Sequence, residues 1–272
     1  MATVSYFQNI EYPQPSLESI VCTFTIALNE NIQQILLEFL IFELRRPTDG
    51  NCDDDEFLVT GQNRNFIVPL LCGINTGQHM FIDVDKSPTK IIHLSIYGKL
   101  PYQRTFNIKV TQVQNRITSK GCLQYFSGRN GIIKSFNYDV VGDTVDSKEE
   151  ASYFNNLNYA ICIEREENMC SITYTNVIND EMSDFSIVNV DTYKNSPSFV
   201  NYCPDDFLAI NGDRLCGEIL SDTIASKSIY DDADNPHSIT DYGTGPIILS
   251  FKSDNMYVGR GFKIHYEQNF CN

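Results

Sequence analysis

The sequence lacks several features that would place the chain in a membrane or mark its route out of the cell. It has no apolar stretch near the about 20 residues that a membrane-spanning helix needs, so we expect no membrane span. Its opening segment, Met1–Gln8, has neither the basic region nor the apolar region of a signal peptide. No Asn-x-Ser/Thr acceptor for an N-glycan occurs. We interpret the missing signal peptide as a natural N-terminus that begins before Met1.

Motifs of common enzyme classes are missing too. The four histidines form no His-Glu-x-x-His motif or paired metal ligands, and no Gly-x-Ser-x-Gly occurs; they are His79, His93, His237 and His265. No Cys-x-x-Cys pair indicates a zinc ribbon or a redox site. Carboxylates are abundant, but in a chain of net charge −15 their number says little about glycosidase chemistry. We therefore expect no catalytic activity.

Positive charge is scarce, and the imbalance is uneven. Residues 1–120 hold 10 Lys+Arg and 12 Asp+Glu, whereas residues 121–272 hold 10 and 23. Phosphate binding needs a basic surface, so we expect no nucleic acid partner. The second half suits a cationic ligand, such as a basic protein surface or a divalent cation.

The most informative feature present is a motif that occurs twice. Cys52-Asp-Asp-Asp-Glu-Phe-Leu-Val-Thr-Gly61 is followed by Leu71-Cys72-Gly73, and Cys203-Pro-Asp-Asp-Phe-Leu-Ala-Ile-Asn-Gly212 by Leu215-Cys216-Gly217. Each copy places an acidic turn and a short apolar strand between two cysteines. The repeat predicts two homologous units with the disulfides Cys52–Cys72 and Cys203–Cys216. Cysteines that frame strands are typical of an oxidising compartment, so we expect a secreted, extracellular protein.

Period-two alternation and β-branched or aromatic runs dominate the chain, as in Ile20–Ala27 and Phe106–Val113. Many short strands separated by Gly, Asn, Asp and Pro predict an all-β fold with one antiparallel sandwich in each half. We predict a first domain at residues 1–116, truncated at its N-terminus, and a second at residues 120–272. The polar stretch Gln114–Gly121 joins them.

The repeated Cys-x-x-Asp…Cys-Gly pattern resembles the CUB domain, an extracellular jelly-roll-like β-sandwich. Gly131-Ile-Ile-Lys-Ser-Phe-Asn-Tyr138 is similar to the family's Gly-x-Ile-x-Ser-Pro-Asn-Tyr, with Phe136 in place of proline. Ile247–Asp254 and Gly261-Phe262 resemble its closing strands. Together the two copies cover nearly the whole chain. The chain is also similar to tandem CUB proteins of arthropods in Gly77–Val84, Phe106–Gln112 and Gly121–Phe126.

The resemblance leaves the other cysteines with two pairings. Cys162 would pair with Cys122, as in most CUB domains, or with Cys170 across a hairpin, and Cys271 would take the one left over. Cys22 and Cys162 lie in equivalent strands, and by analogy Cys22 would pair before Met1 or with position 33, which is Gln here. We therefore predict an unpaired Cys22, which is a buried, inert thiol, a free thiol or an intermolecular link.

Many CUB domains bind calcium through acids and a tyrosine at one end of the sandwich. In the second copy, the resemblance assigns this role to Tyr138, Asp180, Asp206 and Asp254. Calcium prefers six to eight oxygen ligands, and carboxylates from separate loops would supply them.

The first copy has Tyr12, Glu43 and Asp55 at the matching positions, but its closing segment Leu94–Pro101 contains no acid. We therefore predict calcium in the second domain only. In calcium-binding CUB domains the ion and its acids often hold a Lys or Arg of a partner.

These patterns predict a non-catalytic, secreted recognition protein that binds an extracellular protein or another cationic ligand through the loop ends of its sandwiches. The alternative is the accessory region of a larger extracellular protease or receptor. A catalytic domain in the same full-length polypeptide would decide for the alternative.

Overall fold

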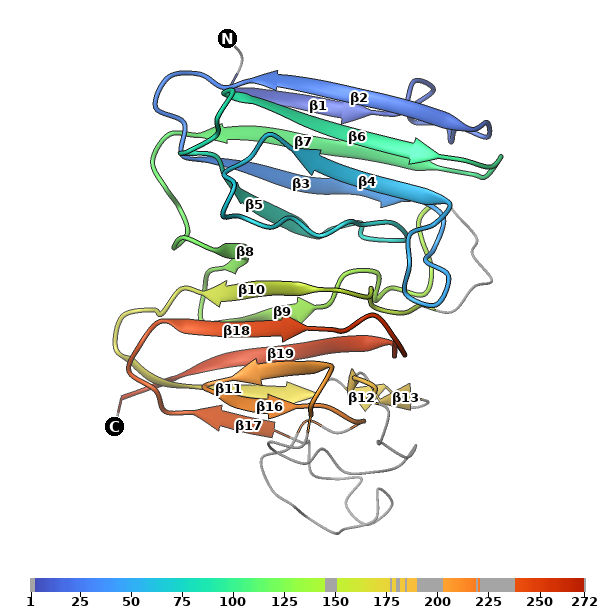
Figure 1. Cartoon of the computed structure of the whole chain (residues 1–272). Helices are drawn as coiled ribbons and strands as arrows, with labels where there is room; N and C mark the ends of the chain where they lie inside the picture. The colour runs from blue at the N-terminus through green and yellow to red at the C-terminus, as the bar shows by residue number, and fades with distance from the viewer. Residues whose placement is uncertain are drawn as a thin grey trace.

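The computed structural model describes residues 3–144, 151–176, 178–179, 182–183, 185–189, 203–218, 220 and 238–271. In these ranges the chain forms strands and turns and no helix, arranged as two sandwiches that lie one above the other (Figure 1). It therefore contains no helix there that is long and apolar enough to cross a membrane. The all-β architecture predicted from the sequence is confirmed.

The first sandwich contains strands β1 to β7. They are β1 (Val4–Gln8), β2 (Ile20–Ala27), β3 (Gln34–Glu43), β4 (Asp55–Thr60), β5 (His79–Asp83), β6 (Ile91–Gly98) and β7 (Thr105–Val113). One sheet has the order β1-β7-β3-β5 and the other the order β2-β6-β4. Period-two alternation turns every second side chain inward: in β6, Ile92, Leu94 and Ile96 are fully buried. Between the sheets, Phe42 and Phe57 pack edge to face at 5.4 Å.

The second sandwich contains the remaining strands. They are β8 (Cys122–Phe126), β9 (Asn130–Lys134), β10 (Asn158–Ile163), β11 (Met169–Asn176), β12 (Ile178–Asn179), β13 (Met182–Ser183), β14 (Phe185–Ser186), β15 (Phe207–Ile210), β16 (Asp213–Leu215), β17 (Ser238–Asp241), β18 (Ile247–Lys252) and β19 (Gly261–Phe270). One sheet has the order β16-β15-β18-β10-β8 and the other the order β14-β19-β11-β17, with β9 also paired to β19; β12 and β13 form a separate hairpin. Its pairs are antiparallel except for β8 and β10, which run parallel.

The motif strand has the same pairing register in both sandwiches. In the first sandwich, Leu94 of β6 is paired with Val59 of β4 on one side and with Phe24 of β2 on the other. In the second, Leu249 of β18 is paired in the same way with Ile210 of β15 and with Ile161 of β10. The motif cysteines form disulfides in both copies, Cys52–Cys72 and Cys203–Cys216. The two copies of the motif therefore occupy matching positions in the two sandwiches.

Two further disulfides join Cys122 to Cys162 and Cys170 to Cys271. This is the first of the two pairings left open above. Cys22 is a free, half-buried thiol, and burial raises its pKa.

The register shows that Cys22 and Cys162 are not equivalent, although their strands are. Phe24 and Ile161 occupy equivalent positions, because they pair with the equivalent leucines Leu94 and Leu249. Two residues earlier, Cys22 is therefore equivalent to Tyr159, and it packs against the core. Cys162 is equivalent to Thr25, whose side chain faces outward. A shift of one residue moves a side chain to the other face of a sheet, so Cys22 is not the remnant of a second Cys122–Cys162 bond.

Buried polar groups hold the two sandwiches together. Asn137, fully buried, accepts hydrogen bonds at Oδ1 from Arg46 Nη1 (2.9 Å) and from the backbone N–H of Ile74 (3.0 Å). Its Nδ2 donates to the carbonyl of Ser152 at 2.7 Å, and its backbone N–H donates to Oδ1 of Asn75 at 2.8 Å. One asparagine of the second sandwich thus contacts three residues of the first.

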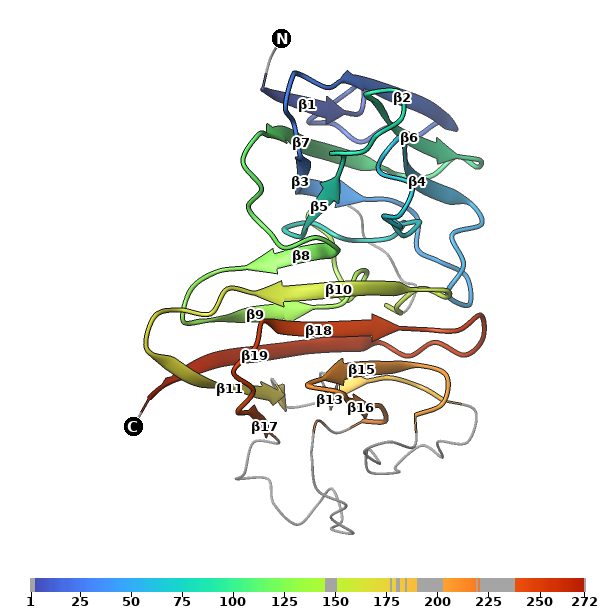
Figure 2. The same cartoon turned by 60° about the vertical axis from the view of Figure 1, so that its left-hand side comes forward.

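A second contact joins the sheets edge to edge. Strands β5 and β8 lie side by side in both views (Figures 1 and 2). The N–H of Tyr125 in β8 donates to Nε2 of His79 in β5 at 3.1 Å, and Nε2 of Gln124 donates to Oε1 of Gln78 at 3.1 Å. The stretch Gln114–Gly121 runs between β7 and β8 and is bound by Gln34 and Asp83 of the first sandwich.

Candidate functional site

Two acids of the second sandwich meet at one end of its sheet. Asp206 lies directly before β15, and Asp254 lies shortly after β18. These strands are antiparallel neighbours, with Phe207 opposite Lys252, so the start of one lies beside the end of the other. The strand pairing therefore brings together two acids that are 48 residues apart.

The Asp206 carboxylate is buried, with only 1% of the residue exposed. Its Oδ1 accepts a hydrogen bond from the backbone N–H of Asp254, and its Oδ2 accepts one from the hydroxyl of Tyr153, each at 2.6 Å. Burial, together with the charges of Asp254 and Asp205, raises the pKa of Asp206 to about 6. The site concentrates negative charge where solvation is poor, as a cation-binding site does.

Neighbouring residues hold this acid in place. Asn189 accepts hydrogen bonds at Oδ1 from the backbone N–H groups of Asp205 (3.0 Å) and Asp206 (3.1 Å), and its Nδ2 donates to the carbonyl of Asp206 at 2.8 Å. The Tyr153 hydroxyl in turn accepts from the N–H of Val188 at 3.1 Å. The carboxylate is thus oriented from both sides before any ligand binds.

Of the four residues assigned by resemblance, the structure brings Asp206 and Asp254 together. Tyr138 is buried beneath the guanidinium of Arg260, 4.5 Å from the ring centre. Asp180 lies outside the described residues. In the part of the chain that is described, no three His, Cys, Asp or Glu side chains form a metal-binding cluster.

Tyr153 is the residue that sequence reasoning missed. It lies just before β10, is fully buried, and its ring packs edge to face on Phe251 at 5.3 Å. Its sequence signal is the aromatic pair Tyr153-Phe154 at the entry to a strand, which is ordinary for a core residue. Only the fold shows that its hydroxyl reaches an acid 53 positions later.

The same end of the first sandwich is arranged differently. Asp55, equivalent to Asp206, is fully buried and accepts two hydrogen bonds from Arg104, from Nε at 2.7 Å and from Nη2 at 2.6 Å. Glu43 accepts hydrogen bonds from the backbone of Asp143 and from Thr144, in the second sandwich. Arg104 thus places a positive charge beside Asp55, and Glu43 contributes to the contact between the two sandwiches. Tyr12 is half-buried in a turn.

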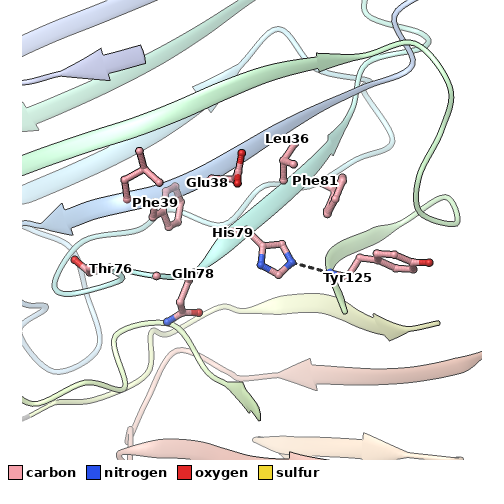
Figure 3. Close-up of a pocket in the computed structure, with 10 residues that line it drawn as sticks. Leu36, Glu38, Phe39, Thr76, Gln78, His79, Phe81 and Tyr125 are labelled. Carbon is pink, nitrogen blue, oxygen red and sulfur yellow. Dashed lines mark hydrogen bonds between the residues drawn. The ribbon is translucent and has the colours of Figure 1, made fainter. Parts of the chain in front are cut away.

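A second concave region lies on the outer face of the first sandwich, next to β8 (Figure 3). This open pocket has a volume of about 440 Å³, and its lining includes Leu36, Glu38, His79, Phe81 and Tyr125. Burial lowers the pKa of His79, so the imidazole is neutral near pH 7. Glu38 is paired with Lys109 at 2.7 Å. The pocket is shallow and its lining is partly polar and partly apolar. Its side chains do not form a catalytic group.

The raised pKa of Asp206 predicts how stability changes with pH when divalent cations are removed. A carboxyl that holds its proton more tightly in the folded state stabilises the fold at low pH, and this contribution is lost as pH rises from about 4 to about 6. Urea unfolding after chelation should therefore show the free energy of unfolding falling over this range relative to Asp206→Asn. A constant difference between the two proteins would show that Asp206 titrates normally.

The animal CUB domain family matches residues 119–269, more than half of the chain. Among solved structures, the CUB1-EGF-CUB2 domain of human MASP-1/3 is 17% identical, with 98% of this chain and 100% of that one covered and a TM-score of 0.34. The same domains of rat MASP-1 are 16% identical, with coverage of 98% and 98% and a TM-score of 0.34. The extracellular region of zebrafish Gpr126/Adgrg6 is 13% identical, with 98% of this chain and 33% of that one covered and a TM-score of 0.35. No curated protein matches. On the family match, this chain belongs to the animal CUB domain family.

Proposed function

We propose that this protein is a non-catalytic, extracellular recognition protein whose second sandwich binds calcium at the Asp206 end and, through it, a basic side chain of a partner protein. Membership of the CUB family supports a binding role outside the cell. Four disulfides support an oxidising compartment.

The observation that carries the proposal is the buried carboxylate of Asp206, held beside Asp254. Burial raises the pKa of Asp206, and the charges of Asp254 and Asp205 add to this effect, so its negative charge is poorly compensated in the folded state. A carboxylate oxygen that accepts one hydrogen bond retains a lone pair for a cation. The donor set consists of hard oxygens, which suits calcium.

Asp206 and Asp254 would hold the ion, with Asp180 as the further acid expected from the sequence. Tyr153 and Asn189 would act as positioning residues, since they orient Asp206 through its side chain and its backbone. Bound calcium would supply positive charge that offsets the repulsion between the acids. Residues 121–272, with 10 Lys+Arg against 23 Asp+Glu, would then attract a basic partner over a longer range.

Calcium titration by calorimetry tests this proposal. We expect weak binding typical of extracellular modules, so that millimolar calcium stabilises the protein by about 0.5–1.5 kcal/mol. Asp206→Ala should abolish the binding heat. Asp213→Asn, which removes an exposed acid on β16, should leave it unchanged.

No binding heat in the unmodified protein, or equal heat in Asp206→Ala, would contradict the calcium site. The partner is tested separately by capture from extracellular fluid with calcium or with a chelator. A basic protein retained only with calcium, and lost with Asp206→Ala, would support the recognition mechanism.

A further inference from the structure

Side chains make the edge-to-edge contact between β5 and β8. The two strands belong to different sheets, and in the described part of the chain no backbone ladder joins them. The imidazole of His79 in β5 instead reaches the backbone of β8, where the N–H of Tyr125 donates to its Nε2 at 3.1 Å (Figure 3). The contact therefore depends on whether this imidazole can accept a hydrogen bond.

This hydrogen bond fixes which nitrogen of His79 carries the proton. A nitrogen that accepts an N–H must offer a lone pair, so Nε2 is unprotonated and the neutral ring carries its hydrogen on Nδ1. A second proton can bind only at Nε2, where the lone pair already faces the N–H of Tyr125. The imidazolium has a donor at both nitrogens and cannot accept this hydrogen bond. Protonation of His79 and its contact with Tyr125 therefore exclude each other.

Aromatic rings and one ion pair surround the imidazole. The ring of His79 packs edge to face against Phe81 of β5 at 5.8 Å and against Phe126 of β8 at 5.0 Å. Burial lowers the pKa of His79. Glu38 of β3 lies directly opposite and favours the charged ring, but its carboxylate is paired with Lys109 of β7 at 2.7 Å. The surroundings thus keep the ring neutral at neutral pH.

The other ionisable groups near this edge have partners of their own. Asp83, on the same face of β5, accepts hydrogen bonds from Arg116 and from the N–H of Gly121. On the β8 side, burial and the carboxylates of Glu164 and Glu166 raise the pKa of Tyr125 to about 12, so the phenol is neutral. Histidine is the side chain whose ordinary pKa, about 6.5, lies between neutral and mildly acidic pH. His79 is therefore the group at this edge that responds to mild acid.

We propose that mild acid opens the contact between β5 and β8, because the proton that His79 takes up occupies the nitrogen that holds Tyr125. The network around Asn137 contains no group that titrates near pH 6, so the sandwiches stay attached there while the β5–β8 edge is released. The pocket of Figure 3 changes with this edge, since Tyr125 forms part of its lining. The protein thus has one arrangement at neutral pH and a looser one in an acidified compartment.

Hydrogen exchange of the Tyr125 amide measures this opening. In the open state His79 takes up a proton with its ordinary pKa of about 6.5, whereas the closed state holds it less readily, so proton uptake drives opening as pH falls. After correction for the intrinsic pH dependence of exchange, protection of the Tyr125 amide should fall roughly tenfold between about pH 7 and about pH 5. The amide of Ile74, which donates to Asn137, should keep its protection over this range.

Matched variants assign the effect to His79. In His79→Gln an amide oxygen replaces Nε2 as the acceptor and does not titrate, so protection of the Tyr125 amide should no longer depend on pH. His93→Gln is the control, because His93 lies on β6 of the same sandwich and contacts Thr25 at an exposed position. This control should lose protection at Tyr125 in acid as the unmodified protein does.

Nuclear magnetic resonance of the unmodified protein gives a second test that needs no substitution. The nitrogen signals of the His79 ring should show an unprotonated Nε2 at neutral pH. The ring and the Tyr125 amide should then titrate with one shared midpoint, below the ordinary histidine value of about 6.5. Separate midpoints, a midpoint at or above that value, or a Tyr125 amide that ignores pH would overturn the proposal. So would equal loss of Tyr125 protection in acid by His79→Gln and the unmodified protein.

Discussion

Replacing Arg104 with methionine should destabilise the protein by about 3–5 kcal/mol, the usual cost of removing one partner of a buried ion pair. Both side chains of the Arg104–Asp55 pair are completely buried. The variant would leave a carboxylate in the core with its charge uncompensated. The guanidinium also donates to the carbonyls of Glu18, Leu100 and Tyr102, and these would lose a donor. Urea unfolding of the full chain measures the loss.

A double variant separates charge from packing. In Asp55→Asn with Arg104→Met no charge remains in the core, so much of the stability should return. A single Arg104→Met variant as stable as the unmodified protein would show that Asp55 is solvated or bound elsewhere. A double variant that is no better than the single one would assign the loss to packing and to the three carbonyls.

The second large effect is expected at the junction, where Asn137→Ala should cost about 3 kcal/mol and loosen the two sandwiches relative to each other. The variant leaves the N–H of Ile74 and a guanidinium N–H of Arg46 without their acceptor, and a buried donor without a partner costs about 1–3 kcal/mol. Asn137 also has a φ of 57°, which alanine adopts at a cost of about 1–2 kcal/mol. Small-angle X-ray scattering should show a larger radius of gyration, and urea unfolding should show the lost stability.

Asn155→Ala is the matched control for this prediction. Asn155 also spans the junction, donating to the carbonyl of Asp49 at 2.9 Å, but this contact is exposed to solvent. Its loss should change stability and scattering little. Equal behaviour of the two variants would mean that the buried network around Asn137 does not hold the sandwiches together.

The central strands and the repeat could be predicted from sequence because they depend on local patterns. Expected ranges such as Ile20–Ala27 and Phe106–Val113 coincide closely with β2 and β7. The repeated spacing from cysteine to glycine corresponds to equivalent strands, since the same acidic turn and apolar strand recur in the same order. Short strands with mixed polarity, such as β1 and β17, carry no comparable signal and were not expected.

The candidate site was only partly predictable. Asp206 and Asp254 were assigned by the family resemblance, and the pairing of β15 with β18 brings them together. Tyr153 could not be found in this way, because its role depends on where one hydroxyl points in the core. The distinction between Cys22 and Cys162 was hidden for a related reason: it rests on a one-residue offset in register that cysteine spacing does not reveal.

By itself, the sequence determined the class of fold, the repeated motif, the motif disulfides and the acidic character of the second half, since each depends on residue type and short-range order. The tertiary structure alone decided that Arg104 neutralises Asp55, that Asn137 joins the sandwiches, and that the hydroxyl of Tyr153 reaches Asp206. These contacts join residues many positions apart, with 49 separating Asp55 from Arg104, and their strength depends on burial, which exists only once the chain has folded.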